Sequence, residues 1–341
     1  MRLEIEVVIW RGSIAESRHR VQAAVSDPAG RLVAATADAH AVTTFRSAAK
    51  PFQLLPLVER GHADRFGFDD EALAVMAASH TGSAYHLDLV RRILARLELE
   101  DRHLACGFHE PLDPDARELL AKGAAVPSPL YNNCSGKHAG MLALALAEGW
   151  PVEGYERADH PVQRLMRVSV AQACGLEAEE LAVAVDGCSV SVFALPISAM
   201  ARGYARLATA TDQDEPRGRA LARIRAAMQS HPRAVGGGGR LSSALMEVAG
   251  RHLVAKGGAE GLECLGLLSP GLGLAVKCED GQTRAVGPAV VALLTHLGHL
   301  SERELGALEA WRTPVLHNYA GHEVGRIEAT VRPLAAVTTP A

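Results

Sequence analysis

The chain lacks long apolar runs, an excess of charge of one sign, and a dense set of cysteines. No run approaches the about 18 uninterrupted apolar residues of a membrane span, so we expect no membrane partner. The formal net charge of -4 at pH 7 gives no basic face for nucleic acid. Six cysteines in 341 residues are too sparse for a disulfide framework. The first residues, MRLEIEVVIWRGS, also lack the basic-then-apolar layout of a secretion signal. We therefore expect a cytoplasmic protein whose cysteines are core residues, metal ligands or nucleophiles.

The composition, 48% hydrophobic and 22% charged residues, is that of an ordinary globular protein. Short apolar segments near the N-terminus predict strands at 3–9, 20–26 and 32–37. From residue 50 the spacing of apolar residues becomes helical, and it predicts helices at 50–58, 70–78, 84–98, 114–122, 137–149, 160–174 and 190–208. Residues 211–219 are polar and predict an exposed connection. After the glycine run 236–239 we expect a helix at 241–250, strand-like segments at 252–256, 262–268 and 272–278, and a helix at 284–298.

Strands near both ends with helices between them predict an α/β protein of the α+β kind. Its antiparallel-rich sheet would be built from both termini, with a helical lobe inserted between the halves. We expect a single catalytic unit over 1–341, in which 1–45 and 235–341 form the sheet lobe and 46–234 the mainly helical lobe.

Ser47 and Lys50 form a Ser-x-x-Lys pair where strands give way to a helix. Because residues three apart share a helix face, the lysine amine would lie beside the serine hydroxyl and could take its proton. The helix N-terminus would favour the developing negative charge. The alternative is a solvated lysine beside an unrelated serine.

A second serine, Ser79, lies in a cluster of small hydroxyl residues, and Lys256 ends a late strand before two glycines. The alternatives here are helix capping by Ser79 or Thr81, and a solvated lysine at a strand end. In chain order, these elements resemble the active-site set of serine β-lactamases and penicillin-binding proteins. Two of the three differ from the Ser-Asp-Asn and Lys-Thr-Gly of those enzymes. The order therefore favours an acyl-transfer hydrolase but not a β-lactam substrate.

Cysteine, lysine and histidine crowd together at the start of a predicted helix, as Cys134, Lys137 and His138. Farther along, a strand-like run ends at Asp186 and Cys188. Two thiolates from separate elements, with an acid nearby, could hold zinc. Cys134 could instead be a nucleophile with His138 one turn away, or both cysteines could be buried structural residues.

The chain resembles the rhizobial-type L-asparaginases, the asparaginase II family of serine β-lactamase-like fold, in the segments FRSAAKPFQ, SHTG, LYNNCSGKHAGML, DGCSVSVFALP, GGGGR and VAKGGAEG. The resemblance covers residues 5–330, nearly the whole chain. It implies an L-asparagine amidohydrolase that releases aspartate and ammonia. It also implies a homodimer and one zinc ion per chain that is not the attacking species.

By position, the resemblance makes Ser47 and Lys50 the nucleophile and its base, and Ser79 and Lys256 a second serine–lysine pair. The expected zinc ligands are Cys134, Lys137 and Cys188, with Asp186 near the water on zinc. The expected substrate contacts are Arg46, His80, Asn133 and His138. Backbone amides at the start of the Ser47 helix and at Gly257–Gly258 would hold the oxyanion.

Two other functions remain open at this point. One is a related serine amidohydrolase acting on glutamine, a peptide or a β-lactam. The other, of a different class, is a non-catalytic zinc-holding interaction protein.

Overall fold

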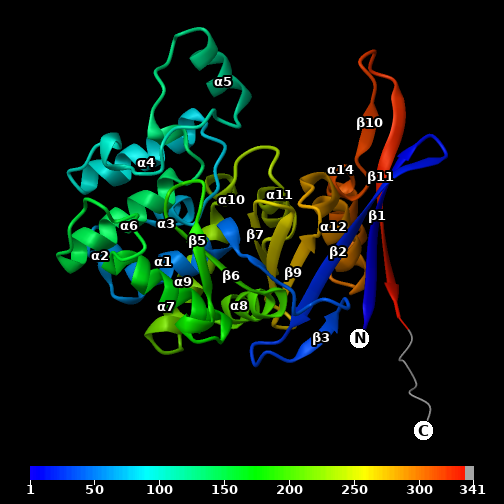
Figure 1. Ribbon diagram of the computed structural model, residues 1–341, viewed down its shortest axis with the longest axis horizontal. Helices are drawn as coiled ribbons and strands as arrows, with labels where there is room; N and C mark the ends of the chain where they lie inside the picture. The colour runs from blue at the N-terminus through cyan, green and yellow to red at the C-terminus, as the bar shows by residue number, and fades with distance from the viewer. Residues whose placement is uncertain (335–341) are drawn as a thin grey trace.

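The computed structural model describes residues 1–334. Most helices gather on one side of the molecule and the large sheet on the other (Figure 1). The sheet has the strand order β10-β11-β1-β2-β9-β8-β7, with β3 paired to β2, and all its pairings between strands are antiparallel. Its strands are β1 (Leu3–Arg11), β2 (Ile14–Ser26), β3 (Leu32–Ala35), β7 (Leu253–Gly258), β8 (Leu262–Leu267), β9 (Leu272–Cys278), β10 (Val315–His317) and β11 (Glu323–Pro333).

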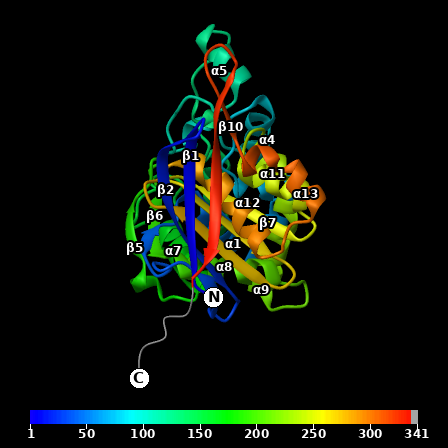
Figure 2. The same ribbon diagram turned by 90° about the vertical axis from the view of Figure 1, so that its right-hand side faces the viewer.

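The sheet joins the two ends of the chain. Strand β1 pairs with β11, with Val7 opposite Ala329, and β2 pairs with β9, with Ala24 opposite Ala275. The N-terminus lies beside the end of β11, where the Leu334 amide donates to the Arg2 carbonyl at 2.9 Å (Figures 1 and 2). This arrangement confirms the prediction of an α+β protein whose antiparallel sheet is built from both termini. Residues 335–341 of the predicted sheet lobe lie outside the described range.

Helices fill the middle of the chain, as the periodicity of its apolar residues predicts. The longer ones are α1 (Lys50–Glu59), α3 (Asp70–Met76), α4 (Ala84–Arg96), α5 (Pro114–Ala121), α6 (Ser135–Glu148), α7 (Pro161–Cys174), α8 (Ile197–Thr209), α9 (Pro216–Ser230), α11 (Leu241–Ala249) and α12 (Val286–His296). The short ones are α2 (His62–Arg65), α10 (Pro232–Val235), α13 (Glu302–Ala307) and α14 (Glu309–Arg312). Among residues 1–334, none is both long enough and apolar enough to cross a bilayer.

Two predicted segments were wrong. The first part of the predicted helix 190–208 is strand β6 (Ser191–Pro196), which pairs with β4 (Val42–Thr44) and β5 (Ala182–Val185) in a second, small sheet. Proline disfavours the helical conformation in the residue before it, so the helix begins only after Pro196. The predicted connection 211–219 ends early, because α9 starts at Pro216, a residue whose fixed φ suits the first helical turn.

Helix α8 joins the helical side to the sheet by packing against β2, β8 and β9. Its contact with β9 depends on Gly273, where a Cβ would come within 1.9 Å of the Ala201 carbonyl oxygen. Helix α8 also carries Tyr204, whose hydroxyl donates to the Ala48 carbonyl at 2.7 Å. The sheet, α8 and the start of α1 are thereby held in one arrangement.

Candidate active site

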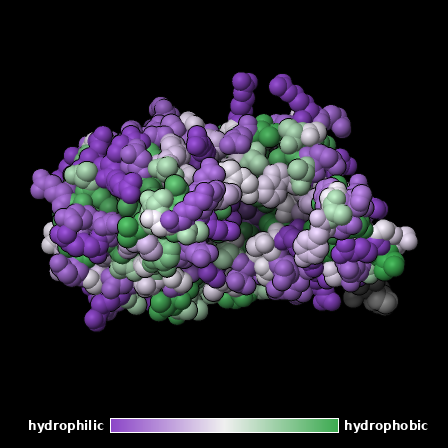
Figure 3. All heavy atoms as spheres, turned by 90° about the horizontal axis from the view of Figure 1, so that it is seen from above, coloured by the Kyte–Doolittle hydropathy of each residue, from purple (hydrophilic) through white to green (hydrophobic). Residues whose placement is uncertain are grey.

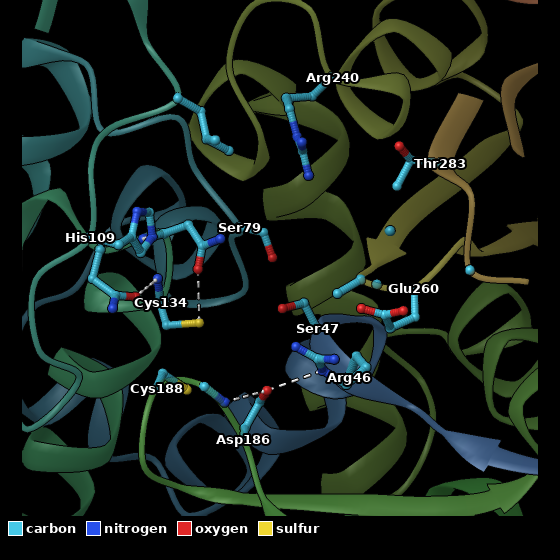
Figure 4. Close-up of a pocket in the computed structure, with 18 residues that line it drawn as sticks. Arg46, Ser47, Ser79, His109, Cys134, Asp186, Cys188, Arg240, Glu260 and Thr283 are labelled. Carbon is cyan, nitrogen blue, oxygen red and sulfur yellow. Dashed lines mark hydrogen bonds and ion pairs between the residues drawn. The ribbon is translucent and has the colours of Figure 1, made fainter. Parts of the chain in front are cut away.

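A polar cavity of about 450 Å³ lies where loops from both sides of the molecule meet. Seen from above, the surface is hollowed between a larger and a smaller part (Figure 3). The cavity is lined by the segments 46–47, 132–134, 186–188 and 257–260, and by the separate residues Ser79, His109, Leu112, Arg240, Gly281 and Thr283 (Figure 4). These segments come from distant parts of the chain, so the cavity exists only in the folded protein.

Ser47 is brought to the cavity by a sharp change of direction at Arg46. Arg46 has a φ of 47°, a left-handed conformation that is uncommon for a residue other than glycine. The chain turns there from β4 into a short 3-10 helix, η1 (Arg46–Ala49), and then into α1. The Arg46 side chain forms an ion pair with Asp186, with Nε 3.0 Å from Oδ1. This pair ties the turn to the β5–β6 loop and leaves Ser47 at the cavity surface.

Lys50 does not lie where the Ser-x-x-Lys spacing predicts. Its fully buried amine donates to the Ala78 carbonyl, to Ser79 Oγ at 3.1 Å and to the Asn133 carbonyl at 3.4 Å. Among residues 1–334, no hydrogen bond joins Lys50 to the Ser47 hydroxyl. Three acceptors deeper in the protein satisfy the amine better than one hydroxyl at the cavity surface.

Lys256 reaches the same serine from the sheet. Its buried amine, at the end of β7, donates to Ser79 Oγ at 2.9 Å and to the Gly257 carbonyl at 2.6 Å. Ser79 itself is held by its backbone amide, which donates to the Val235 carbonyl at 2.9 Å. It does not cap the following helix, because the N-cap position of α4 belongs to Ser83.

Burial weakens the proton affinity of both lysines, and the charge of Lys50 weakens that of Lys256 further. Burial lowers the pKa of Lys50 below its ordinary value. Burial, and then the charge of Lys50, place the pKa of Lys256 well below 10.5. A lowered pKa favours the neutral amine that a general base requires.

A buried acid, Glu263, acts on the charge of Lys256, and no pattern in the sequence pointed to it. Glu263 on β8 accepts a hydrogen bond from Ser242 Oγ at 2.6 Å, and Ser242 accepts one from the Gly257 amide at 2.7 Å. Burial raises the pKa of Glu263 to about 7. Because the Gly257 amide is occupied in this way, it is not available to hold an oxyanion.

The predicted metal ligands lie together beside the cavity. Lys137 Nζ donates to Cys188 Sγ at 2.9 Å, and Cys134 Sγ lies 3.1 Å from Asn133 Oδ1. Cys134 is the N-cap residue of α6, while Cys188 comes from the β5–β6 loop. Two sulfurs and one amine from two separate elements therefore converge, as the resemblance implies.

The Cys134 thiol has a pKa well below its ordinary value. The main cause is the hydrogen bond from Cys188, which outweighs burial, and the charges of Lys137 and Lys50 act in the same direction. That same hydrogen bond, followed by burial, raises the pKa of Cys188. Burial would lower the pKa of Lys137, but the two neighbouring sulfurs outweigh it and raise the value. The lowered pKa of Cys134 favours a thiolate, and the raised pKa of Lys137 favours an ammonium group beside it.

Of the four predicted substrate contacts, Arg46 and Asn133 line the cavity and the two histidines do not. His80 is completely buried, with Nε2 2.9 Å from Ser135 Oγ and Nδ1 accepting from the Gly82 amide at 3.2 Å. His138 is also buried, with Nδ1 2.6 Å from the Tyr155 hydroxyl. Burial places the pKa of each histidine well below 6.5, so neither offers a charge to a substrate carboxylate.

Sequence reasoning missed several residues that line the cavity. They are His109, Arg240, Glu260 and Thr283. Arg240 had a visible signal, since it directly follows the four-glycine run. The other three lie in loops with no distinctive pattern, and only the fold brings them to the cavity.

A concave site with a few converging polar groups is typical of an enzyme that acts on a small molecule. The family follows from comparison: residues 7–329 match the model of the L-asparaginase II family, so the chain belongs to that family.

Structures of Mglu are also similar to this chain. The native form has 17% identity and a TM-score of 0.33, covering 85% of this chain and 64% of that chain. The form with tris and glutamate has 19% identity and a TM-score of 0.36, covering 86% and 63%. The present chain thus spans less than two thirds of the Mglu chains. No curated protein matches it.

Proposed function

We propose that the protein hydrolyses the side-chain amide of L-asparagine to aspartate and ammonia. One observation carries this proposal: two buried lysine amines meet at the Ser79 hydroxyl in the cavity that Ser47 also lines. Ser47 and Ser79 both line the cavity, and the two amines beside Ser79 have lowered pKa values. Serines in such surroundings are suited to acyl transfer. The predicted serine β-lactamase-like plan rests on the same three motifs.

Ser47 is the proposed nucleophile. Its oxygen attacks the amide carbon, and its proton passes to the Lys50 amine, which leaves Ser79 to receive it. Catalytic hydrogen bonds often form only when substrate is bound, so the absence of a Ser47–Lys50 bond among the described residues is compatible with this step. Ser79, held by Lys256, gives a proton to the departing ammonia, and water then hydrolyses the aspartyl ester.

The oxyanion formed in this attack needs donors that are not already used. The Ser47 amide belongs to the first turn of a helix, where amides have no partner within the helix. On the other side of the cavity we assign the role to Ala259, two residues after Gly257. Ala259 lines the cavity in the turn that follows β7. Such a donor is worth about 3–4 kcal/mol in other enzymes.

Zinc is the proposed metal of the cluster formed by Cys134, Lys137 and Cys188. The pKa of Cys134 lies well below its ordinary value, which favours the thiolate form that binds zinc. Lys137 has to lose its proton to bind, which makes metal binding dependent on pH. When bound, zinc supplies a positive charge that can polarise a substrate oxygen beside the cavity. Asp186, paired with Arg46, lies between this cluster and Ser47 (Figure 4).

Ammonia release from L-asparagine tests the proposal. We expect Ser47→Ala to abolish it while leaving the far-ultraviolet circular dichroism unchanged, whereas the matched change Ser243→Ala outside the cavity keeps it. Near-normal turnover by Ser47→Ala would remove Ser47 from its role. Assays of glutamine and a β-lactam alongside asparagine decide between the proposed substrate and those of related hydrolases.

A further inference from the structure

Arg240 presents a positive charge to the cavity, and among residues 1–334 it forms no ion pair, although its charge acts on the buried Glu263. It lies between the glycine run 236–239 and α11, and its side chain extends into the cavity from above Ser79 and Ser47 (Figure 4). Within the described part of the chain, its guanidinium has no hydrogen bond or ion pair. A guanidinium has five donors in a fixed planar arrangement that matches a carboxylate.

The other basic groups of the cavity are already occupied. Arg46 is paired with Asp186 at 3.0 Å. His109 accepts a hydrogen bond from the Asn133 amide at Nε2, at 2.9 Å, and its Nδ1 lies 2.7 Å from the Glu110 carbonyl, which can only accept. Both ring nitrogens of His109 therefore already have hydrogen-bond partners. Arg240 is therefore the group suited to bind an anionic part of a ligand.

Glu260 supplies the opposite charge from the sheet side. It lies in the turn between β7 and β8 with a φ of 60°, and its carboxylate points toward Ser47 (Figure 4). A Cβ at Gly281 would come within 2.7 Å of this carboxylate, so that glycine leaves room for it. Among residues 1–334, the Glu260 carboxylate has no ion-pair partner. An unpaired cation and an unpaired anion thus face the cavity near the proposed nucleophile.

We infer that Arg240 binds the α-carboxylate of the substrate and that Glu260 binds its α-ammonium group. This inference rests on the proposed function and adds to it. With the α-carboxylate and the α-ammonium group both bound, the side-chain amide of the substrate is held at Ser47. The two contacts also restrict the enzyme to amides of amino acids whose α-carboxylate and α-ammonium groups are free. Arg46, which the sequence suggested for the carboxylate, is a positioning residue for the turn.

Three amide substrates separate the two contacts. L-asparagine carries both charged groups, succinamic acid lacks the amino group, and 3-aminopropanamide lacks the α-carboxylate. We expect Arg240→Gln to lower kcat/KM roughly 10- to 100-fold for L-asparagine and succinamic acid, the usual range for a lost charge-assisted hydrogen bond. Its turnover of 3-aminopropanamide stays at the wild-type level. Glu260→Gln shows the converse, with losses for L-asparagine and 3-aminopropanamide but not for succinamic acid.

Matched controls are Arg251→Gln, an exposed arginine just beyond the other end of α11, and Glu247→Gln, an exposed acid on α11. Both controls keep wild-type values, and Arg240→Lys recovers part of the loss.

Equal effects of Arg240→Gln on all three amides, or no effect on L-asparagine, overturn the inference while the proposed function stands. If the wild-type enzyme releases no ammonia from L-asparagine, the proposed function fails, and calorimetric binding of L-asparagine decides the inference instead. Binding that Arg240→Gln weakens supports it, and no binding or unchanged binding overturns it.

Discussion

The amines of Lys50 and Lys256 lie on the same hydroxyl oxygen, that of Ser79, at 3.1 and 2.9 Å. Lys50 comes from the first turn of α1 and Lys256 from the end of β7, so the helical side and the sheet meet at this oxygen. Two buried ammonium groups so close together repel each other, and burial also disfavours both charges. The arrangement places two amines with lowered pKa values next to one hydroxyl in a cavity.

Replacing Lys256 by arginine tests whether a neutral amine is needed. Arginine keeps the positive charge but stays protonated throughout the working pH range. We expect Lys256→Arg to lower kcat by a factor of roughly 10² to 10⁴, the usual contribution of a general acid or base. Lys122→Arg, at an exposed lysine, is the matched control. For the wild type, kcat/KM should rise with pH through a midpoint below 10.5, because burial lowers the pKa of Lys50, the proposed base.

Glu263→Gln tests the buried acid through stability. The folded-state pKa of about 7 is raised above the ordinary 4.5. Between these values the folded protein holds a proton that the unfolded chain has lost, so the free energy of unfolding falls as pH rises. The slope is at most about 1.4 kcal/mol per pH unit. Urea unfolding at pH 5, 6 and 7 should show this fall for the wild type and for the exposed control Glu247→Gln. The same fall in Glu263→Gln would assign it to another group.

Loss of a sulfur should remove the metal. We expect purified wild-type protein to carry one zinc ion per chain, and Cys134→Ser and Cys188→Ser each to lower zinc affinity at least roughly 100-fold. Cys174→Ser changes a buried thiol on α7 outside the cluster, and it should keep the metal. Elemental analysis and competition with a chromogenic chelator give the measurement. Full zinc content in both cluster variants would contradict the assignment.

Gly273→Ala tests the packing of α8 on the sheet. The new Cβ would lie 1.9 Å from the Ala201 carbonyl oxygen, so α8 or β9 has to move. We expect a loss of at least about 1–3 kcal/mol in the free energy of unfolding, the usual cost of overpacking. The control is Gly306→Ala in α13, where a Cβ meets nothing within 4 Å. Alanine there should stabilise by about 0.5–1 kcal/mol. Equal denaturation midpoints for the two variants would contradict this account.

Local patterns in the sequence predicted most elements correctly. In β1, Leu3, Ile5, Val7 and Ile9 are buried at alternate positions, as one face of a strand against the core requires. The same reasoning failed at 190–196, because a buried strand and a buried helix segment carry similar apolar runs. It also missed β11, whose pairing with β1 is set by a partner more than 300 residues away.

The candidate site was predictable in its residues but not in its contacts. The family resemblance of short motifs predicted that Ser47, Ser79, Lys256 and the cysteine cluster lie near one another. In the structure, all of them line or adjoin the cavity. The motif spacing suggested that Lys50 bonds Ser47, whereas the structure directs Lys50 to Ser79. Spacing along a helix describes neighbours on that helix only, and here the better acceptors come from other elements.

The sequence by itself determined the kind of protein. Its apolar periodicities specify a mixed helix and strand chain, and its motifs specify the L-asparaginase II family. Only the tertiary structure decided which charged groups among residues 1–334 face the cavity without an ion pair, and for this reason we assign the substrate contacts to Arg240 and Glu260 instead of Arg46 and His80. The physical reason is that whether a charged group is free depends on the partners that folding brings to it. Those partners, such as Asp186 for Arg46, lie far away along the chain.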